Sequence, residues 1–249
     1  MRDLLDVWRN TRMVVLVALT AGLYAAILIP FKVGIPLLPG LTEVRPANAI
    51  PIVCSLLFGP AAAWGAAFGN LIGDLFGTLT LGSVFGFIAN FLYGYVPYRV
   101  WGAHRLARRE SSPGQIGGRA LAEFVLVAGL ASLVCAVVIG WGVEALGLAP
   151  FAALGNIVLL NNFLVAVVLG PPLLAALYPR VRRWGLLHWQ MLDREPVRAS
   201  ARTTLGVLIC WVGAAGTLVL GNYLAIQQAD IVFGVMPSVL LMLLGALLI

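Results

Sequence analysis

The sequence predicts an all-α membrane protein, a polytopic bundle of transmembrane helices. Of the 249 residues, 61% are hydrophobic and only 10% are charged, whereas soluble globular proteins are about 25% charged. The mean hydropathy of +0.98 is correspondingly high. The few charged residues are gathered between long apolar runs, so the outer surface of the folded chain is expected to face lipid.

Eight apolar runs are the candidate spans, because a helix needs roughly 20 residues to cross about 30 Å of hydrocarbon. We expect these spans near residues 13–30, 46–59, 60–77, 83–101, 121–142, 152–177, 204–225 and 231–249. Only Gly59-Pro60 joins the second span to the third, which favours a tight turn, since proline is tolerated at the first position of a helix. Both spans are short, so one of them could be partly re-entrant.

The arginines predict the orientation, because positive residues accumulate in cytoplasmic loops. Fourteen of the sixteen basic residues form three groups that an eight-span chain places on one side: Arg2, Arg9 and Arg12; Arg99, Arg105, Arg108, Arg109 and Arg119; and Arg180, Arg182, Arg183, Arg194, Arg198 and Arg202. Both termini are therefore predicted to be cytoplasmic, in a multi-pass protein of the cell membrane. This topology and the anionic inner leaflet explain the net charge of +6, so nucleic-acid binding is not needed to account for it.

The chain divides into three predicted parts: a six-span core over 1–180, a basic cytoplasmic linker over 181–203 and a two-span segment over 204–249. Within the linker, the run 184–192 is either an amphipathic helix on the membrane surface or an ordinary loop. The two-span segment has no role that the sequence assigns.

The third span carries the most distinctive pattern. Gly65, Gly69, Gly73 and Gly77 recur every four residues and would form a smooth stripe that lets another helix approach closely. Asn70 and Asp74 share a neighbouring face of the same helix. An ionisable side chain at membrane depth is costly and usually faces a cavity, a partner or a transport path. The alternative, an aspartate satisfied by neighbouring helices, remains open.

Other polar residues fall at a similar height when the spans are threaded together, in the outer half of the bilayer. With Arg45 from the first external loop, they form the predicted substrate-binding set: Arg45, Asn48, Asn70, Asp74, Asn90, Trp141, Glu144 and Asn156. A few hydrogen-bonding groups amid apolar walls are typical of a ligand pocket. The loop over 31–47 contains three prolines and could form a lid, in which Lys32 and Arg45 would suit an anionic ligand or would simply be solvated charges.

The first span has a row of small residues, Ala18, Gly22 and Ala26. Such a row lets a second membrane helix approach closely. The spacing alone does not decide between a partner protein and packing inside the fold.

Motifs that the chain lacks narrow its chemistry. No G-x-x-x-x-G-K-[ST] loop occurs, so this chain is not expected to hydrolyse ATP itself. Neither G-x-S-x-G nor H-E-x-x-H occurs, which disfavours a membrane hydrolase. The two histidines, His104 and His188, lie in connecting segments, so no metal site and no cofactor are expected.

Residues 18–27 of the first span, the sequence Phe58-Gly-Pro, and Gly65 and Gly69 followed by Gly73-Asp-Leu-Phe-Gly77 carry a family resemblance. Together they make residues 13 to about 180 resemble the substrate-binding S component of energy-coupling factor (ECF) vitamin transporters. The resemblance implies six helices that capture a vitamin or related micronutrient from outside, under loops that include the one after the first span.

The resemblance also implies partners: a transmembrane coupling subunit, which Ala18, Gly22 and Ala26 would contact, and two cytoplasmic ATPases that drive transport. The competing hypotheses are a self-contained secondary transporter that uses Asp74 as a proton site and a small membrane enzyme. The substrate remains open among cobalamin, riboflavin, folate, pantothenate and queuosine precursors.

Overall fold

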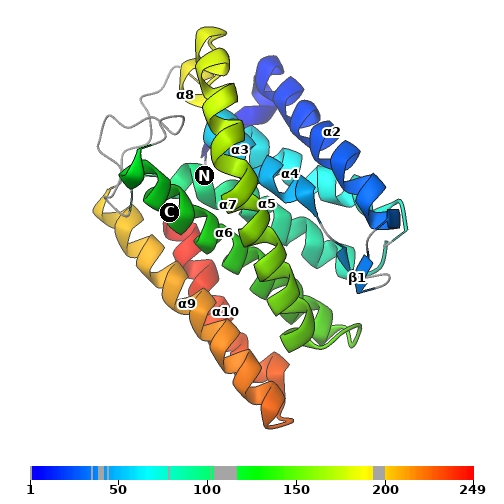
Figure 1. Cartoon of the computed structure of the whole chain (residues 1–249). Helices are drawn as coiled ribbons and strands as arrows, with labels where there is room; N and C mark the ends of the chain where they lie inside the picture. Colours follow the sequence, from blue (N-terminus) through cyan, green and yellow to red (C-terminus); the bar gives the residue numbers. More distant parts are fainter. Residues whose placement is uncertain are drawn as a thin grey trace.

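The computed structural model describes residues 2–34, 36–38, 42–43, 45–77, 79–101, 103, 117–192 and 200–249. These residues form a helical bundle (Figure 1). Its helices are α1 (Arg2–Asp6), η1 (Val7–Arg9), α2 (Thr11–Gly34), η2 (Pro46–Asn48), α3 (Ala49–Phe58), α4 (Pro60–Asp74), α5 (Gly82–Val100), α6 (Gly118–Ala145), α7 (Phe151–Arg183), α8 (His188–Met191), α9 (Ala201–Ile226) and α10 (Ile231–Leu248). Between α2 and η2, β1 (Pro36–Leu38) and β2 (Thr42–Glu43) pair in an antiparallel ribbon.

The predicted fold class is confirmed, and each of the eight expected spans coincides with one helix. Among the described residues, five helical stretches are long and apolar enough to cross a membrane: Thr11–Phe31, Gly118–Ala145, Phe151–Met191, Ala201–Ile226 and Ile231–Leu248. Helices α3 and α4 have only 10 and 15 residues, or about 15 and 22 Å at 1.5 Å per residue. They form a short hairpin. Helix α5 is also not among the five stretches, so the crossing of the bilayer by α3, α4 and α5 stays a prediction.

A glycine turn makes this hairpin possible. Gly59 has a φ of 56°, a conformation that residues with a Cβ rarely adopt, and Pro60 begins α4 immediately afterwards. A Cβ added to Gly59 would lie 2.7 Å from Cγ of His188 in α8. The turn therefore fits tightly against α8, the short helix that the structure forms in the run 184–192.

The arginine-rich end of the bundle gathers segments from along the chain. Asn10, just before α2, donates a hydrogen bond from Nδ2 to the carbonyl of Met191 in α8 (3.4 Å). The ring of Tyr98, near the end of α5, lies 5.7 Å from the ring of His188. The start of α2, the α3–α4 turn, the end of α5 and α8 thus lie together at one end.

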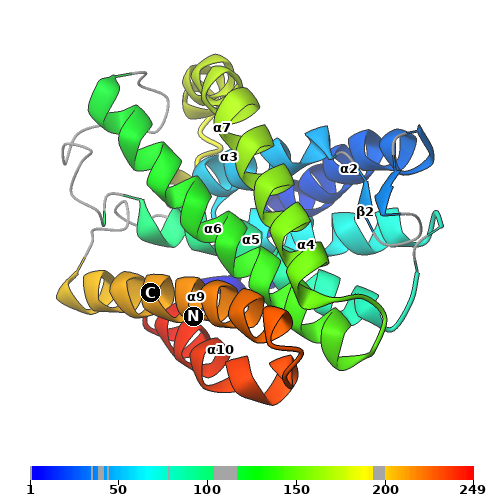
Figure 2. The same ribbon diagram turned by 60° about the horizontal axis from the view of Figure 1, so that its bottom comes forward.

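Helix α2 packs against α4 through the predicted glycine stripe. A Cβ added to Gly65 would lie 2.5 Å from Cβ of Thr20, and one added to Gly69 would lie 2.9 Å from the carbonyl oxygen of Ala21. Close packing of this kind holds membrane helices together where lipid supplies no hydrophobic driving force between them. The pair α9–α10 lies on the other side of the bundle, against α6 (Figure 2).

Candidate functional site

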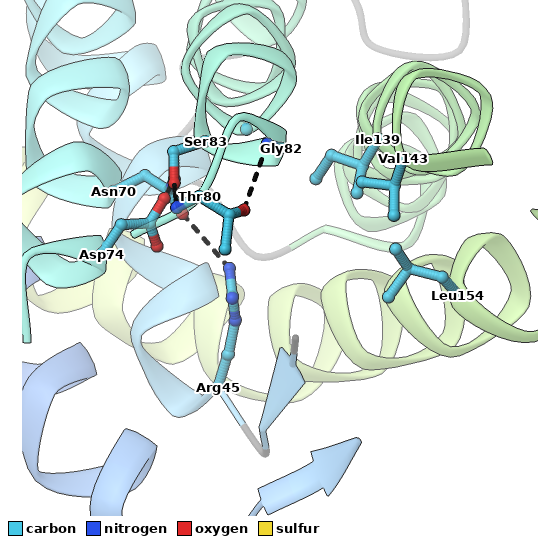
Figure 3. Close-up of a pocket in the computed structure, with 10 residues that line it drawn as sticks. Arg45, Asn70, Asp74, Thr80, Gly82, Ser83, Ile139, Val143 and Leu154 are labelled. Carbon is cyan, nitrogen blue, oxygen red and sulfur yellow. Dashed lines mark hydrogen bonds between the residues drawn. The ribbon is translucent and has the colours of Figure 1, made fainter. Parts of the chain in front are cut away.

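A small pocket is drawn in Figure 3. It lies at the opposite ends of the helices from the arginine-rich end, because it is lined from the end of α4, the start of α5, the end of α6 and the start of α7. It is lined by Arg45, Asn70, Asp74, Thr80, Gly82, Ser83, Gly86, Ile139, Val143 and Leu154. These residues come from the segment before η2, the end of α4, the start of α5, the end of α6 and the start of α7. Five chain segments therefore converge on one site.

The polar side of the pocket is a chain of side-chain hydrogen bonds. Arg45 Nη1 donates to Asn70 Oδ1 (3.2 Å), and Asn70 Nδ2 donates to Asp74 Oδ2 (3.1 Å). The pairing of Asn70 with Asp74 follows from their spacing of one helical turn on α4. A guanidinium, an amide and a carboxylate thus stand in a row, and such a row can meet both hydrogen-bond donors and acceptors of a ligand.

The start of α5 completes this polar side. Gly82 donates its backbone N–H to Thr80 Oγ1 (3.1 Å), and Thr80 donates its own N–H to Ser83 Oγ (3.3 Å). A Cβ added to Gly86 would lie 3.0 Å from Asn70 Nδ2, so glycine at this position leaves room for the amide. The partial positive charge of a helix N-terminus also lies at the pocket.

The opposite side is apolar. Ile139 and Val143 project from α6 and Leu154 projects from α7, facing Arg45 across the pocket (Figure 3). The free space between the two sides is about 50 Å³, enough for a few water molecules. Pockets for drug-sized ligands hold about 300–1,000 Å³. A larger ligand therefore enters only if the lining moves, and Arg45 has the longest side chain in that lining, with the largest number of rotatable bonds.

Asn48 and Asn90 lie in a separate buried network. The Tyr24 hydroxyl lies 2.9 Å from Asn48 Oδ1 and 3.0 Å from Asn90 Oδ1. Asn48 Nδ2 donates to Asn162 Oδ1, and Asn90 Nδ2 donates to the Gly86 carbonyl (2.9 Å). The network joins α2, the segment after Arg45, α5 and α7, so it holds the helices beneath the pocket in register.

Trp141, Glu144 and Asn156 lie outside the pocket lining and make contacts elsewhere. Trp141 Nε1 donates to the carbonyl of Val232 in α10 (3.1 Å). Glu144 accepts the backbone N–H of Phe151 at the start of α7, and Asn156 Nδ2 donates to Asn222 Oδ1 in α9 (2.7 Å). The predicted set is therefore split, with Arg45, Asn70 and Asp74 in the pocket. The Lys32 side chain lies outside the described residues.

The sequence prediction did not include Thr80 and Ser83, although threonine and serine are favoured close to the start of a helix. It also did not include Tyr24, which is completely buried. No sequence signal marks Tyr24, because its hydrogen-bond partners come from distant parts of the chain.

The predicted interface row lies on the outer face of α2. Ala18, Gly22 and Ala26 are all exposed, and no atom lies within 4 Å of a Cβ built on Gly22. Ala21 and Ala25, one residue before Gly22 and Ala26, are buried. The two rows of small residues on α2 therefore face different ways, one buried toward α4 and one exposed on the outside of the described part of the chain.

Comparison with known proteins gives a match to a protein family. The sequence model of the family described as QueT transporter matches residues 14–179. No curated protein and no solved structure matches the chain. The matched region runs from α2 to α7 and leaves α9 and α10 outside.

Proposed function

The chain belongs to the QueT transporter family, whose members are S components that take up queuosine precursors, and from this premise we propose its specific task. It captures a queuosine precursor at the outer face of the cell membrane for an ATP-driven ECF importer. Family membership supports membrane transport of a micronutrient by a multi-pass protein, and transport rather than catalysis is the activity that we propose for this chain. The substrate, the ECF partners and the orientation belong to the proposal.

The pocket is the observation that carries the proposal. Its polar side presents Arg45, Asn70 and Asp74 in a hydrogen-bonded row, and its opposite side is formed by aliphatic side chains. A flat nitrogen heterocycle has donors and acceptors along its edge and apolar faces above and below. The carboxylate would accept ring N–H groups while the guanidinium and the amide would donate to ring acceptors.

The pocket and the arginines lie at opposite ends of the bundle, and this arrangement supports import from outside. The pocket lies at the helix ends remote from Arg9, Arg12 and the Arg180–Arg183 group, and those arginines favour the cytoplasm. Substrate would therefore enter from outside. On α2, the outward row Ala18, Gly22 and Ala26 is the surface proposed for the coupling subunit, which in turn would recruit two cytoplasmic ATPases.

A binding experiment tests the substrate. Purified full-length protein is titrated with free queuosine precursors and, as alternatives, with cobalamin, riboflavin, folate and pantothenate. We expect saturable binding of a queuosine precursor and a loss of about 10- to 100-fold in affinity for Arg45→Ala and for Asp74→Asn, since each removes a charge-assisted hydrogen bond. Arg182→Ala is the control for the loss of a charged side chain, because Arg182 is exposed near the end of α7, at the arginine-rich end of the bundle. Preference for another vitamin would reject the substrate, and unchanged affinity in both pocket variants would reject the site.

A transport experiment tests the coupling. Proteoliposomes that contain this chain alone should not accumulate substrate, whereas those that also contain a coupling subunit and its ATPases should do so when ATP is supplied. Accumulation by the chain alone, driven by a proton gradient and lost in Asp74→Asn, would instead establish the secondary transporter.

A further inference from the structure

The pair α9–α10 lies outside the family match, yet specific contacts hold it against α6 and α7. Asn156 Nδ2 in α7 donates to Asn222 Oδ1 in α9 (2.7 Å), and Asn222 Nδ2 reaches back to Asn156 Oδ1 (3.4 Å). Each amide also donates to a carbonyl one turn earlier in its own helix, at Ala152 and Leu218. Polar side chains paired between membrane helices resist separation, because few alternative partners are available in lipid. This pair therefore fixes the height and rotation of α9 against α7.

Two apolar contacts reinforce the amide pair. Phe151, the completely buried first residue of α7, packs against Gly221: a Cβ added to Gly221 would lie 2.3 Å from Phe151 Cε1. Trp141 of α6 reaches α10 through its hydrogen bond to the Val232 carbonyl. Both helices of the C-terminal pair thus contact the corner where α6 ends and α7 begins.

The same corner forms the apolar side of the pocket. Ile139 and Val143 line the pocket from α6, and Trp141 lies between them in the sequence. Because successive residues turn by about 100° around a helix, Trp141 points away from both. On α7, Leu154 lines the pocket between Phe151 and Asn156, which contact α9. The corner is therefore held between the pocket and the C-terminal pair.

The corner also behaves as one unit. Glu144 near the end of α6 accepts the backbone N–H of Phe151 at the start of α7, which ties the two helix ends together. A displacement of α7 at Phe151 would move Val143 and Leu154 with it. Since the free space in the pocket is about 50 Å³, a small outward movement of this side would change the fit of any ligand.

We propose that α9–α10 is a buttress that positions the apolar side of the pocket, with Gly221 and Asn222 as the positioning residues. The buttress keeps Val143 and Leu154 in contact with the ligand, while the Arg45 side chain moves aside when the ligand enters. The identity of the ligand rests on the proposed function. The role of α9–α10 in positioning Val143 and Leu154 is independent of it.

The first experiment needs no substrate. Val143→Cys is placed in full-length protein whose native cysteines, Cys54, Cys135 and Cys210, are replaced by alanine, and its rate of reaction with a small water-soluble thiol reagent is measured. Adding Asn222→Ala or Gly221→Leu should raise the rate about 5- to 10-fold. Val219→Ala, a change on the same helix at a residue that is 70% exposed, should leave the rate unchanged. Equal rates in all four proteins would overturn the proposal.

The second experiment separates positioning from folding by rescue. Asn222→Leu should weaken binding of a radiolabelled queuosine precursor about 5- to 10-fold, because it removes both hydrogen bonds that join Asn156 to α9. Asn156→Leu combined with Asn222→Leu should restore the affinity to within about twofold, since replacing both partners of a hydrogen bond by apolar groups of similar shape can be nearly neutral. Failure of the double variant to recover would overturn the buttress and would assign Asn156 to the ligand. If the wild-type chain binds no queuosine precursor, the proposed substrate is rejected, and the labelling rates alone decide the buttress.

Discussion

At the scale of single residues, Asp74 shows how a carboxylate is accommodated at the pocket end of a helical bundle. Its side chain is buried with 6% of its surface exposed, which would be costly without hydrogen-bond donors. Asn70 supplies a donor and is itself held by Arg45. The three side chains Arg45, Asn70 and Asp74 therefore satisfy one another when no ligand is bound. Each of them can still replace a hydrogen bond to its neighbour by one to a ligand.

Tyr24 gives the first residue-scale prediction. Tyr24→Phe removes only the hydroxyl that lies between Asn48 Oδ1 and Asn90 Oδ1. Leaving a buried acceptor unsatisfied costs about 1–3 kcal/mol, so the thermal unfolding temperature of the purified protein should fall by several degrees. Tyr223→Phe is the matched control, because its side chain is exposed on α9. Equal falls in both variants would show that the network contributes nothing.

His188 gives a prediction about pH. It lies in α8, beyond the exposed arginines that end α7, and burial against the Gly59 turn lowers its pKa from 6.5 to about 4. The unfolded chain therefore takes up a proton between pH 6.5 and 4 that the folded chain does not, and stability falls as the pH falls through this window. The full loss is about 3 kcal/mol at pH 4. Thermal unfolding followed from pH 7 to 4.5 should show this fall, and His188→Asn should flatten it. Parallel profiles for the two proteins would contradict the assignment.

At the scale of elements, α2 has two faces with different tasks, and this predicts different effects of similar substitutions. Gly69→Leu should destabilise the protein, because the new side chain meets the Ala21 carbonyl. Gly22→Leu has open space around it, so stability and substrate binding should be unchanged while co-purification with a coupling subunit falls at least 10-fold. Ala176→Leu on the exposed face of α7 is the control for adding bulk to the outer surface. Normal assembly of the Gly22→Leu variant would remove α2 from the proposed interface.

The element scale also shows what the sequence could predict of the site. Counting the rise along each helix gives the depth of a residue, which is why Asn70, Asn156 and Trp141 were placed in one layer. Depth does not give the direction around the bundle, and Asn156 and Trp141 turn toward α9 and α10. The pairing of Asn70 with Asp74 was predictable because it depends on one helix only. The approach of Arg45 to Asn70 joins two separate segments of the chain. No local sequence pattern encodes such a contact.

At the scale of the whole molecule, the helices were predictable from hydropathy because lipid requires long apolar segments with internally satisfied backbones. The contribution of α9–α10 was not, because it rests on contacts between a glycine and a phenylalanine 70 residues apart in the sequence. The structure thus joins the helices α2 to α7, which the family match covers, to a pair of helices outside that match.

The side of the membrane on which each connection lies depends only on whether the number of crossings before it is odd or even. A hairpin returns the chain to the side that it left, so the short α3–α4 pair leaves the topology unchanged whether or not it crosses completely. The start of α2 and the end of α5 lie together near α8, and α6, α7, α9 and α10 then alternate. In a cysteine-free protein in intact cells, Leu148→Cys and Ala229→Cys should react with an impermeant thiol reagent, because both positions are exposed in the connections at the pocket end. Thr11→Cys and Ser200→Cys should react only after permeabilisation. Labelling of Leu148→Cys and Ala229→Cys from opposite sides would show that α7 or α9 does not cross, and the pocket would then lose its assigned access to the exterior.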